Sequence, residues 1–201
     1  MDPLSGLEEP INVKSLVRIG RDSRIDGQAI IGYLPTRKLN DSTLTIGEGA
    51  IIRSGSVIYL GSRIGQKFET GHNVIVREEN DILDDVKIWS NTIVDFQCKI
   101  GSNVKIHSNC YISQMSLVED DVFIAPGVLL ANEKYPTGKF SEERIRGPVI
   151  RRGARIGMGT IIMPGVVIGE HSLIGAGALV TKDVPPGAVY YGIPARIHSP
   201  H

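Results

Sequence analysis

The sequence predicts an all-β chain in which short parallel strands wind into one stacked coil. Three observations lead to this fold class. Leu, Ile or Val recurs at every sixth residue, a mostly small residue follows four positions later, and Gly or Asn recurs at every eighteenth residue. An α-helix, with its period of about 3.6, and a β-strand, with its period of about two, do not produce such a repeat. The pattern therefore indicates a parallel β-helix built from six-residue units.

The six-residue repeat runs through most of the chain from Ile46 onward. Branched aliphatic residues fill 20 of the 21 anchor positions, and Thr70 is the exception. The anchors are Ile46, Ile52, Ile58, Ile64, Thr70, Val76, Ile82, Ile88, Val94, Ile100, Ile106, Ile112, Val118, Ile124 and Leu130, and then Ile150, Ile156, Ile162, Ile168, Ile174 and Val180. With a small residue such as Ala50 or Cys98 four positions after most anchors, each unit supplies two inward side chains. That is enough for a short strand and a corner.

Three such units close a triangular coil of eighteen residues, and stacked coils then form parallel strands about 4.8 Å apart. Residues eighteen apart should therefore lie in vertical columns. One column contains only Gly and Asn, namely Gly55, Asn73, Asn91, Asn109, Gly127, Gly159 and Gly177. These residue types tolerate a left-handed backbone conformation, so this column predicts a sharp corner.

The N-terminal region keeps the repeat only in part. Ile19, Ile25 and Ile31 are six residues apart, and the segment GYLPTRKLNDST then interrupts them. We expect an irregular first coil that caps the open edge of the β-helix. The predicted organisation is a cap over 1–45, the β-helix over 46–185 with a loop insertion at 131–149, and a short C-terminal tail over 186–201.

The stretch between Leu130 and Ile150 holds fourteen more residues than the repeat requires. Its charged residues, too polar for a core, are Glu133, Lys134, Lys139, Glu142, Glu143, Arg144 and Arg146. A plain surface loop is one interpretation. The residues around it favour a loop beside an active site, because polar residues share one column of the coil with its first residues. That column contains Glu78, Phe96, Gln114 and Asn132, and continues beyond the insertion with Pro164 and Lys182.

Composition excludes several classes of protein. Lys plus Arg and Asp plus Glu each total 22, so the chain has no net charge to attract nucleic acid or an anionic membrane. No apolar stretch approaches the length of a membrane span. Cys98 and Cys110 form neither a metal-type CxxC motif nor a disulfide framework, and MDPLSGLEEP lacks the regions of a signal peptide. We therefore expect a cytoplasmic protein.

Repeats such as IGSNVK, IGMGTI, IMPGVV, IGEHSL and IGAGAL resemble the hexapeptide-repeat family, whose fold is a left-handed parallel β-helix. The resemblance covers Ile46 to about Arg196. It alone implies the handedness, because general packing preferences favour right-handed crossovers. It also implies a homotrimer of acyltransferase subunits that use acetyl-CoA or a related thioester, with sites between neighbouring prisms.

The stretches GVLLANEKYP and TGHNVIVREEN resemble the branch of the family that acetylates the amino group of nucleotide-linked sugars. There an Asn-Asp pair and a Gln one coil below hold the sugar. The resemblance implies these roles for Gln114, Asn132 and Glu133, although Glu133 departs from the usual Asp. Arg77 is a candidate for the nucleotide phosphates, and a salt-bridged outer face is its alternative.

The residue before Pro136 is Tyr135, where the sugar O-acetyltransferases of the family carry a His. The missing base favours an amine acceptor, because a hydroxyl needs a general base more than an amine does. His107 is the alternative base, with a solvated surface His as its competing interpretation. His72 lies two coils away, about 10 Å by coil stacking, too far to share a metal with ligands at about 2 Å. We expect no metal.

The C-terminal stretch IGAGALVTKDVPPGAVYYGIPARI resembles the coenzyme A end of these transferases. The resemblance implies that Met158, Ala176 and Thr181 line the pantetheine arm and that Lys182 and Arg196 neutralise phosphate. An ordinary exposed lysine is the alternative for Lys182.

The sequence thus predicts an acetyl-CoA-dependent N-acetyltransferase that acts on a nucleotide-linked amino sugar, a precursor of cell-surface polysaccharide such as lipopolysaccharide. The expected catalytic residues are His107, Asn132 and Glu133. Two alternatives remain open. One is O-acyl transfer or transfer of a longer acyl chain to a sugar, and the other is a trimeric β-helix scaffold without activity.

Overall fold

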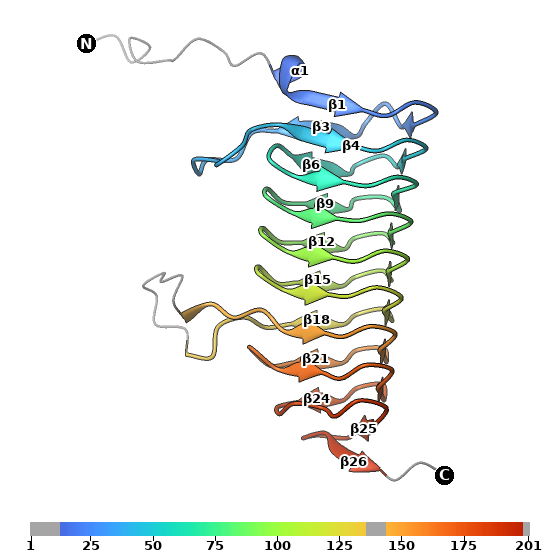
Figure 1. The fold of residues 1–201 in the computed structure, drawn as a ribbon, viewed down its shortest axis with the longest axis vertical. Coiled ribbons are helices and arrows are strands. Elements are labelled where there is room, and N and C mark those ends of the chain that lie inside the picture. Colours follow the sequence, from blue (N-terminus) through green and yellow to red (C-terminus); the bar gives the residue numbers. More distant parts are fainter. Residues whose placement is uncertain (1–12, 136–143, 199–201) are drawn as a thin grey trace, which may run out of the picture.

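The computed structural model of the protein is a parallel β-helix whose coils stack along one axis (Figure 1). It describes residues 13–135 and 144–198. Each coil contributes one strand to each of three parallel sheets, which form the sides of a triangular prism. The coil is left-handed, as the resemblance implies.

The strands are two to four residues long, because each side of the triangle carries only part of an eighteen-residue coil. A helical turn, α1 (Val13–Leu16), precedes them. The first sheet contains β1 (Val17–Ile19), β4 (Leu44–Ile46), β7 (Arg63–Ile64), β10 (Asp81–Ile82), β13 (Lys99–Ile100), β16 (Leu117–Val118), β19 (Val149–Ile150) and β22 (Val167–Ile168). The second contains β2 (Arg24–Ile25), β5 (Ile51–Ile52), β8 (Glu69–Thr70), β11 (Lys87–Ile88), β14 (Lys105–Ile106), β17 (Phe123–Ile124), β20 (Arg155–Ile156), β23 (Leu173–Ile174), β25 (Val189–Tyr191) and β26 (Arg196–His198). The third contains β3 (Ile30–Tyr33), β6 (Val57–Tyr59), β9 (Ile75–Val76), β12 (Ile93–Val94), β15 (Tyr111–Ile112), β18 (Leu129–Leu130), β21 (Ile161–Ile162) and β24 (Leu179–Val180).

The core consists of the predicted anchors and the residues four positions after them. Every one of the 21 anchors is 4% exposed or less. Thr70, the polar exception, is buried and its hydroxyl accepts a hydrogen bond from the backbone N–H of Arg53 at 2.9 Å. Phe68, two residues earlier, is fully buried and supplies volume that Thr70 lacks. The six-residue repeat therefore predicts the core correctly.

The predicted sharp corner is present. All seven members of the Gly and Asn column have a positive φ, between 56° and 74°. This corner joins the second sheet to the third, and we call it the Asn/Gly corner. It comprises residues 53–56, 71–74, 89–92, 107–110, 125–128, 157–160 and 175–178.

A second corner, which joins the third sheet to the first, carries both interruptions of the repeat. We call it the loop corner, and both interruptions project from the same edge of the prism in Figure 1. It comprises residues 34–43, 60–62, 77–80, 95–98, 113–116, 131–135, 144–148, 163–166 and 181–184. Residues 34–43 form the N-terminal excursion, and residues 131–135 and 144–148 form the described part of the insertion.

The first coil is more regular than the sequence suggests. Ile19, Ile25 and Ile31 pair in register with Ile46, Ile52 and Ile58 of the next coil. Regular strand pairing therefore begins at β1, before Ile46. At the other end, β25 extends the second sheet in parallel and β26 pairs antiparallel with it.

Candidate active site

The insertion leaves the prism as two paired limbs. The N–H of Arg146 donates to the carbonyl of Asn132 at 2.8 Å, and Glu133 and Ile145 form an antiparallel bridge. Ile145 is 8% exposed and anchors this base. We call the paired limbs, residues 131–135 and 144–148, the hairpin arm. Asn132 and Glu133 are thus held in an ordered strand pair, while Pro136 and Lys139 to Glu143 lie outside the described residues.

Gln114 is a nearly buried amide without a partner. It is 7% exposed and lies one coil before Asn132 at the loop corner. In the described part of the chain, no residue hydrogen bonds to its side chain. No described side chain has a fully buried nitrogen or oxygen atom without a hydrogen-bond partner, so the amide atoms of Gln114 keep contact with solvent. The Gln114 amide is therefore free to hydrogen bond to a ligand that reaches this corner from the solvent, one coil before Asn132.

A charged network occupies the loop corner around Glu78, three coils before Asn132. The Glu78 carboxylate is fully buried and receives hydrogen bonds from Arg77 at 2.9 and 3.0 Å. Arg37, from the N-terminal excursion, pairs with the same carboxylate at 2.9 Å. The Arg37 guanidinium lies 3.5 Å from the centre of the Phe96 ring. The N-terminal excursion therefore covers this part of the polar column, and the part that contains Gln114 and Asn132 lies beyond it.

Arg77, predicted to contact nucleotide phosphate, is engaged by carboxylates. Besides its two hydrogen bonds to Glu78, it contacts Asp95 at 3.4 Å. The hydrogen bonds to Glu78 raise the pKa of Arg77, and the Coulombic attraction of Glu78 and Asp95 adds to this. Tyr111 donates its hydroxyl proton to Asp95 at 2.6 Å, which completes the network. A phosphate would have to compete with two carboxylates for Arg77, a geometry that favours a structural role.

His107 lies on a different edge of the prism. It belongs to the Asn/Gly corner and stacks on Trp89, with ring centroids 4.5 Å apart and planes 7° apart. Phe123 contacts it in a tilted arrangement at 5.1 Å. In the described chain no carboxylate hydrogen bonds to its ring, although catalytic bases are usually oriented by a third group. The structure does not bring His107 together with Asn132 and Glu133 within one chain.

The predicted cofactor residues divide between the same two corners. Met158 and Ala176 are exposed neighbours, one coil apart, at the Asn/Gly corner. Thr181 and Lys182 are exposed at the loop corner, where Lys182 continues the column of Gln114 and Asn132. Arg196 is exposed on β26 at the end of the second sheet. The residues predicted to bind coenzyme A therefore do not lie together within one chain.

The phase of each residue within the eighteen-residue coil determines its corner. Counting positions within the repeat would therefore have placed His107 and Gln114 at different corners from the sequence alone. The predicted catalytic residues were chosen without this count. The contact between Arg37 and Glu78 could not be found in this way. Arg37 lies in a segment that interrupts the repeat, so counting in steps of eighteen gives it no partner.

Among residues 13–135 and 144–198, no cluster of three or more His, Cys, Asp or Glu side chains could hold a metal ion. Within the same residues, no helix has the length and apolar character needed to cross a membrane.

Comparison with known proteins gives a consistent family. Residues 147–182 match the family model described as bacterial transferase hexapeptide (six repeats). The galactoside O-acetyltransferase of Escherichia coli K12 is 38% identical over 155 residues, which cover 68% of this chain and 75% of that protein.

A shorter match concerns an N-acetyltransferase. The dTDP-3-amino-3,6-dideoxy-alpha-D-galactopyranose 3-N-acetyltransferase of Aneurinibacillus thermoaerophilus is 47% identical over 49 residues, 24% of this chain and 26% of that protein. A solved serine acetyltransferase in complex with cysteine aligns over 52% of this chain and 39% of that chain, with 35% identity and a TM-score of 0.46. The repeats, the fold and the extent of the galactoside O-acetyltransferase match together show that this chain belongs to the hexapeptide-repeat transferases and is an acetyltransferase.

Proposed function

We propose that the protein transfers the acetyl group of acetyl-CoA to the amino group of a nucleotide-linked amino sugar. The observation that carries this proposal is the amide of Gln114, which keeps contact with solvent, has no hydrogen-bond partner among the described residues, and lies one coil from Asn132 and Glu133. An amide offers both hydrogen-bond donors and an acceptor, which suits the hydroxyl and amino groups of a sugar. The absence of a His before Pro136 and the match to a nucleotide-sugar N-acetyltransferase support an amine acceptor.

The complete site would form between neighbouring copies of the chain. Met158 and Ala176 at the Asn/Gly corner of one copy would line the pantetheine arm, opposite the loop corner of the next copy. Small residues at the Asn/Gly corner allow a ligand to approach the backbone. Lys182 and Arg196 are exposed cations, available for the phosphates of coenzyme A. A homotrimer is the assembly that this arrangement favours.

In the transfer step, the uncharged amine nitrogen attacks the thioester carbonyl carbon. The tetrahedral intermediate collapses, the carbon–sulfur bond breaks, and coenzyme A leaves with the proton that the nitrogen loses. Holding both substrates in one cleft supplies much of the rate. Asn132 and Gln114 orient the sugar, and the Glu133 carboxylate accepts the proton from the nitrogen and passes it to the departing sulfur.

O-acetyl transfer is the second candidate, because the galactoside O-acetyltransferase match extends over 155 residues. In that reaction His107 would serve as the general base for a hydroxyl. Its aromatic stack holds the ring in place, but the described chain supplies no carboxylate to orient its tautomer. The N-acetyl reaction needs no such group.

The experiment is thiol release from acetyl-CoA, followed with a thiol-reactive dye. The acceptors are nucleotide-linked 3-amino and 4-amino sugars, with galactosides and serine as comparison. Both cysteines of the chain are buried, so the protein itself should add little signal. Turnover of one amino sugar but not of galactosides supports the proposal. Turnover of galactosides alone would replace it with O-acetyl transfer.

Two variants assign the residues. Gln114→Leu should reduce kcat/KM for the amino sugar by at least about tenfold, since it removes hydrogen bonds to substrate. His107→Asn should leave the amine reaction within about twofold, because an amine does not depend on this base. A loss of all turnover in His107→Asn would instead make His107 the catalytic base.

A further inference from the structure

We propose that the base of the hairpin arm is a binding site for a diphosphate group carried by a substrate, with Lys134 and Arg146 as its main ligands. The proposal rests on the proposed function, in which the acceptor is linked to a nucleotide. It names the residues that would recognise the charged part of that acceptor.

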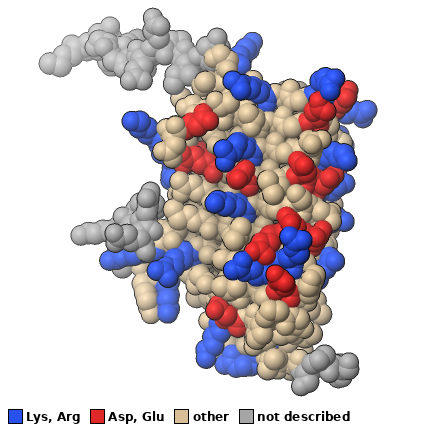
Figure 2. Space-filling view, in the orientation of Figure 1, with Lys and Arg blue, Asp and Glu red and all other residues tan. Residues whose placement is uncertain are grey.

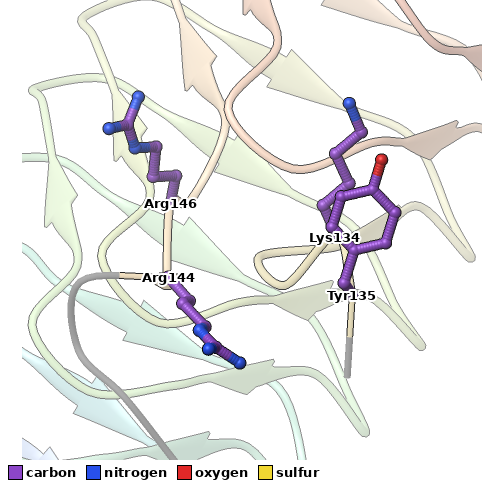
Figure 3. A pocket seen from close by; sticks show the side chains of 4 residues that line it. All are labelled: Lys134, Tyr135, Arg144 and Arg146. Atoms are coloured by element: carbon purple, nitrogen blue, oxygen red, sulfur yellow. The ribbon is translucent and has the colours of Figure 1, made fainter. Parts of the chain in front are cut away.

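The site is a hollow of about 490 Å³ lined by Lys134, Tyr135, Arg144 and Arg146. Figure 3 shows that Lys134 and Tyr135 come from one limb of the hairpin arm, and Arg144 and Arg146 from the other. In this view the side chains of Lys134 and Arg146 extend in the same direction, and Arg144 extends away from them. Lys134 and Arg146 therefore line the hollow from opposite limbs and extend to the same side of it, whereas Arg144 does not.

The hollow is strongly basic for a chain without net charge. The described residues that line it are three cations and one tyrosine, and Figure 2 shows basic side chains gathered at the base of the projecting loop. Among the described residues, neither Lys134 nor Arg146 forms an ion pair, whereas Arg37, Arg77, Arg151 and Arg152 all do. Two cations without ion pairs that line one hollow suit an anion with several negative oxygens.

The backbone fixes Arg146 from two sides. Its N–H donates to Asn132, and its carbonyl accepts from the N–H of Gly165, both at 2.8 Å. Its side-chain stem passes over Gly165, where an added Cβ would lie 3.6 Å from the Cβ of Arg146. The stem therefore packs against the coil at ordinary van der Waals distance, and the guanidinium extends from a fixed base.

Tyr135 adds a flat apolar surface at the same place. Its side chain is 70% exposed, and the Lys134 ammonium lies 5.4 Å from its ring centre. An exposed aromatic ring beside cations can stack on a sugar or base while the cations hold the phosphates. The direct hydrogen bond between Arg146 and Asn132 places the hollow next to the proposed acceptor site.

Coenzyme A also carries a diphosphate, so two sources share this chemistry. Binding is measured by isothermal titration calorimetry with dTDP and, separately, with coenzyme A. The variants are Lys134→Gln and Arg146→Gln, and Arg146→Lys keeps the charge but loses the planar fork. Lys99→Gln is the matched control, because Lys99 is an exposed lysine of the first sheet without an ion pair in the described chain.

We expect both glutamine variants to weaken dTDP binding about five- to tenfold and Arg146→Lys to fall between wild type and Arg146→Gln. Lys99→Gln should match wild type, and circular dichroism should show the same fold for all. A loss confined to coenzyme A would support the same site with the donor as its source. Unchanged affinity for both ligands, or no measurable affinity of the wild-type protein for either, would overturn the site.

These results separate the site from the proposed function. Weakened dTDP binding together with no amino-sugar turnover would keep the diphosphate site and reject the reaction. Turnover of an amino sugar with an unchanged KM in Lys134→Gln and Arg146→Gln would keep the reaction and reject the site.

Discussion

The Asn/Gly corner and the loop corner perform the same turn with different residues. In the Asn/Gly corner every positive-φ position of the regular column is Gly or Asn. In the loop corner the corresponding positions include Glu79, Gln97 and Met115, with φ between 56° and 60°. A left-handed conformation disfavours such side chains by roughly 1–2 kcal/mol per residue. The residues of the Asn/Gly corner tolerate the left-handed backbone conformation by themselves. The residues of the loop corner need contacts with neighbouring residues to stay in it.

The side-chain contacts at the loop corner show what holds it. Glu79 accepts hydrogen bonds from Asn40 at 2.8 Å and from Gln97 at 2.9 Å. Glu78 binds Arg37 and Arg77. The turn at the Asn/Gly corner is stabilised by residue types that favour its backbone conformation, and the turn at the loop corner is stabilised by side-chain contacts. The loop corner, where the backbone is strained, also contains Gln114 and the hairpin arm. Strained residues persist where other contacts compensate, often near functional sites.

The largest expected effect is at the centre of the loop-corner network. Glu78→Gln removes a buried negative charge between two arginines, and we expect the free energy of unfolding to fall by about 3 kcal/mol. Urea denaturation at equal protein concentration measures it. Glu48→Gln, which breaks an exposed pair with Arg21, is the control and should change stability by less than about 1 kcal/mol. Equal effects in the two variants would show that the Glu78 network stabilises the loop corner no more than an exposed ion pair does.

At the Asn/Gly corner, Asn109→Ala should lower the free energy of unfolding by about 1 kcal/mol, because alanine disfavours the φ of 60° found there. Asn109→Gly is the matched control. Glycine adopts this conformation freely, so its effect should be much smaller. Urea denaturation of both variants measures the difference, and similar losses would mean that side-chain contacts stabilise this corner as well.

Met115→Asn introduces into the loop corner a residue type that is typical of the Asn/Gly corner. Relief of the unfavourable φ should raise the free energy of unfolding by about 0.5 kcal/mol, less than the full relief because Met115 is half-buried and loses packing. If the strain positions the adjacent Gln114, kcat/KM should fall several-fold in the same variant. Denaturation and the thiol-release assay measure the two quantities. A gain in stability without loss of activity would show that the strain has no functional role.

The smallest expected effect is a difference in thiol reactivity between Cys98 at the loop corner and Cys110 at the Asn/Gly corner. Burial raises the pKa of Cys98 to about 12, and burial also raises the pKa of Cys110. Both thiols are therefore protonated near neutral pH, and a thiol-reactive dye should label them slowly in the native protein and quickly in denaturant. Cys110, at 3% exposed against 0% for Cys98, should react first. Mass spectrometry of digested samples identifies the order, and rapid native labelling of Cys98 would contradict it.

The sequence contains enough information for the prism and for part of the site. The anchors and the Asn/Gly column follow from local periodicity, because each six-residue unit meets the same environment as the unit eighteen residues away. The extra length of the insertion is also readable, since Leu130 pairs with Ile162 across it. For these features, the partner of each residue can be found by counting eighteen positions along the sequence.

Contacts made by residues in segments that do not follow the repeat could not be predicted from the sequence. Arg37 reaches Glu78 from a segment that has no repeat position, and the pairing of Asn132 with Arg146 joins the two limbs of an irregular loop. For Arg77, the sequence offered phosphate binding or a salt-bridged outer face, and its contacts with Glu78 and Asp95 favour the second. Contacts of long, flexible side chains depend on three-dimensional packing, which periodicity does not encode.

The parallel register around the hairpin arm has a consequence for how such a protein can change. Tyr111 pairs with Leu129 before the arm and Ile161 with Leu179 after it, each at the same eighteen-residue step. The fourteen additional residues leave and re-enter at one edge without shifting any coil. The arm is therefore an exchangeable part: its length and charge can diversify while the rest of the prism keeps its shape.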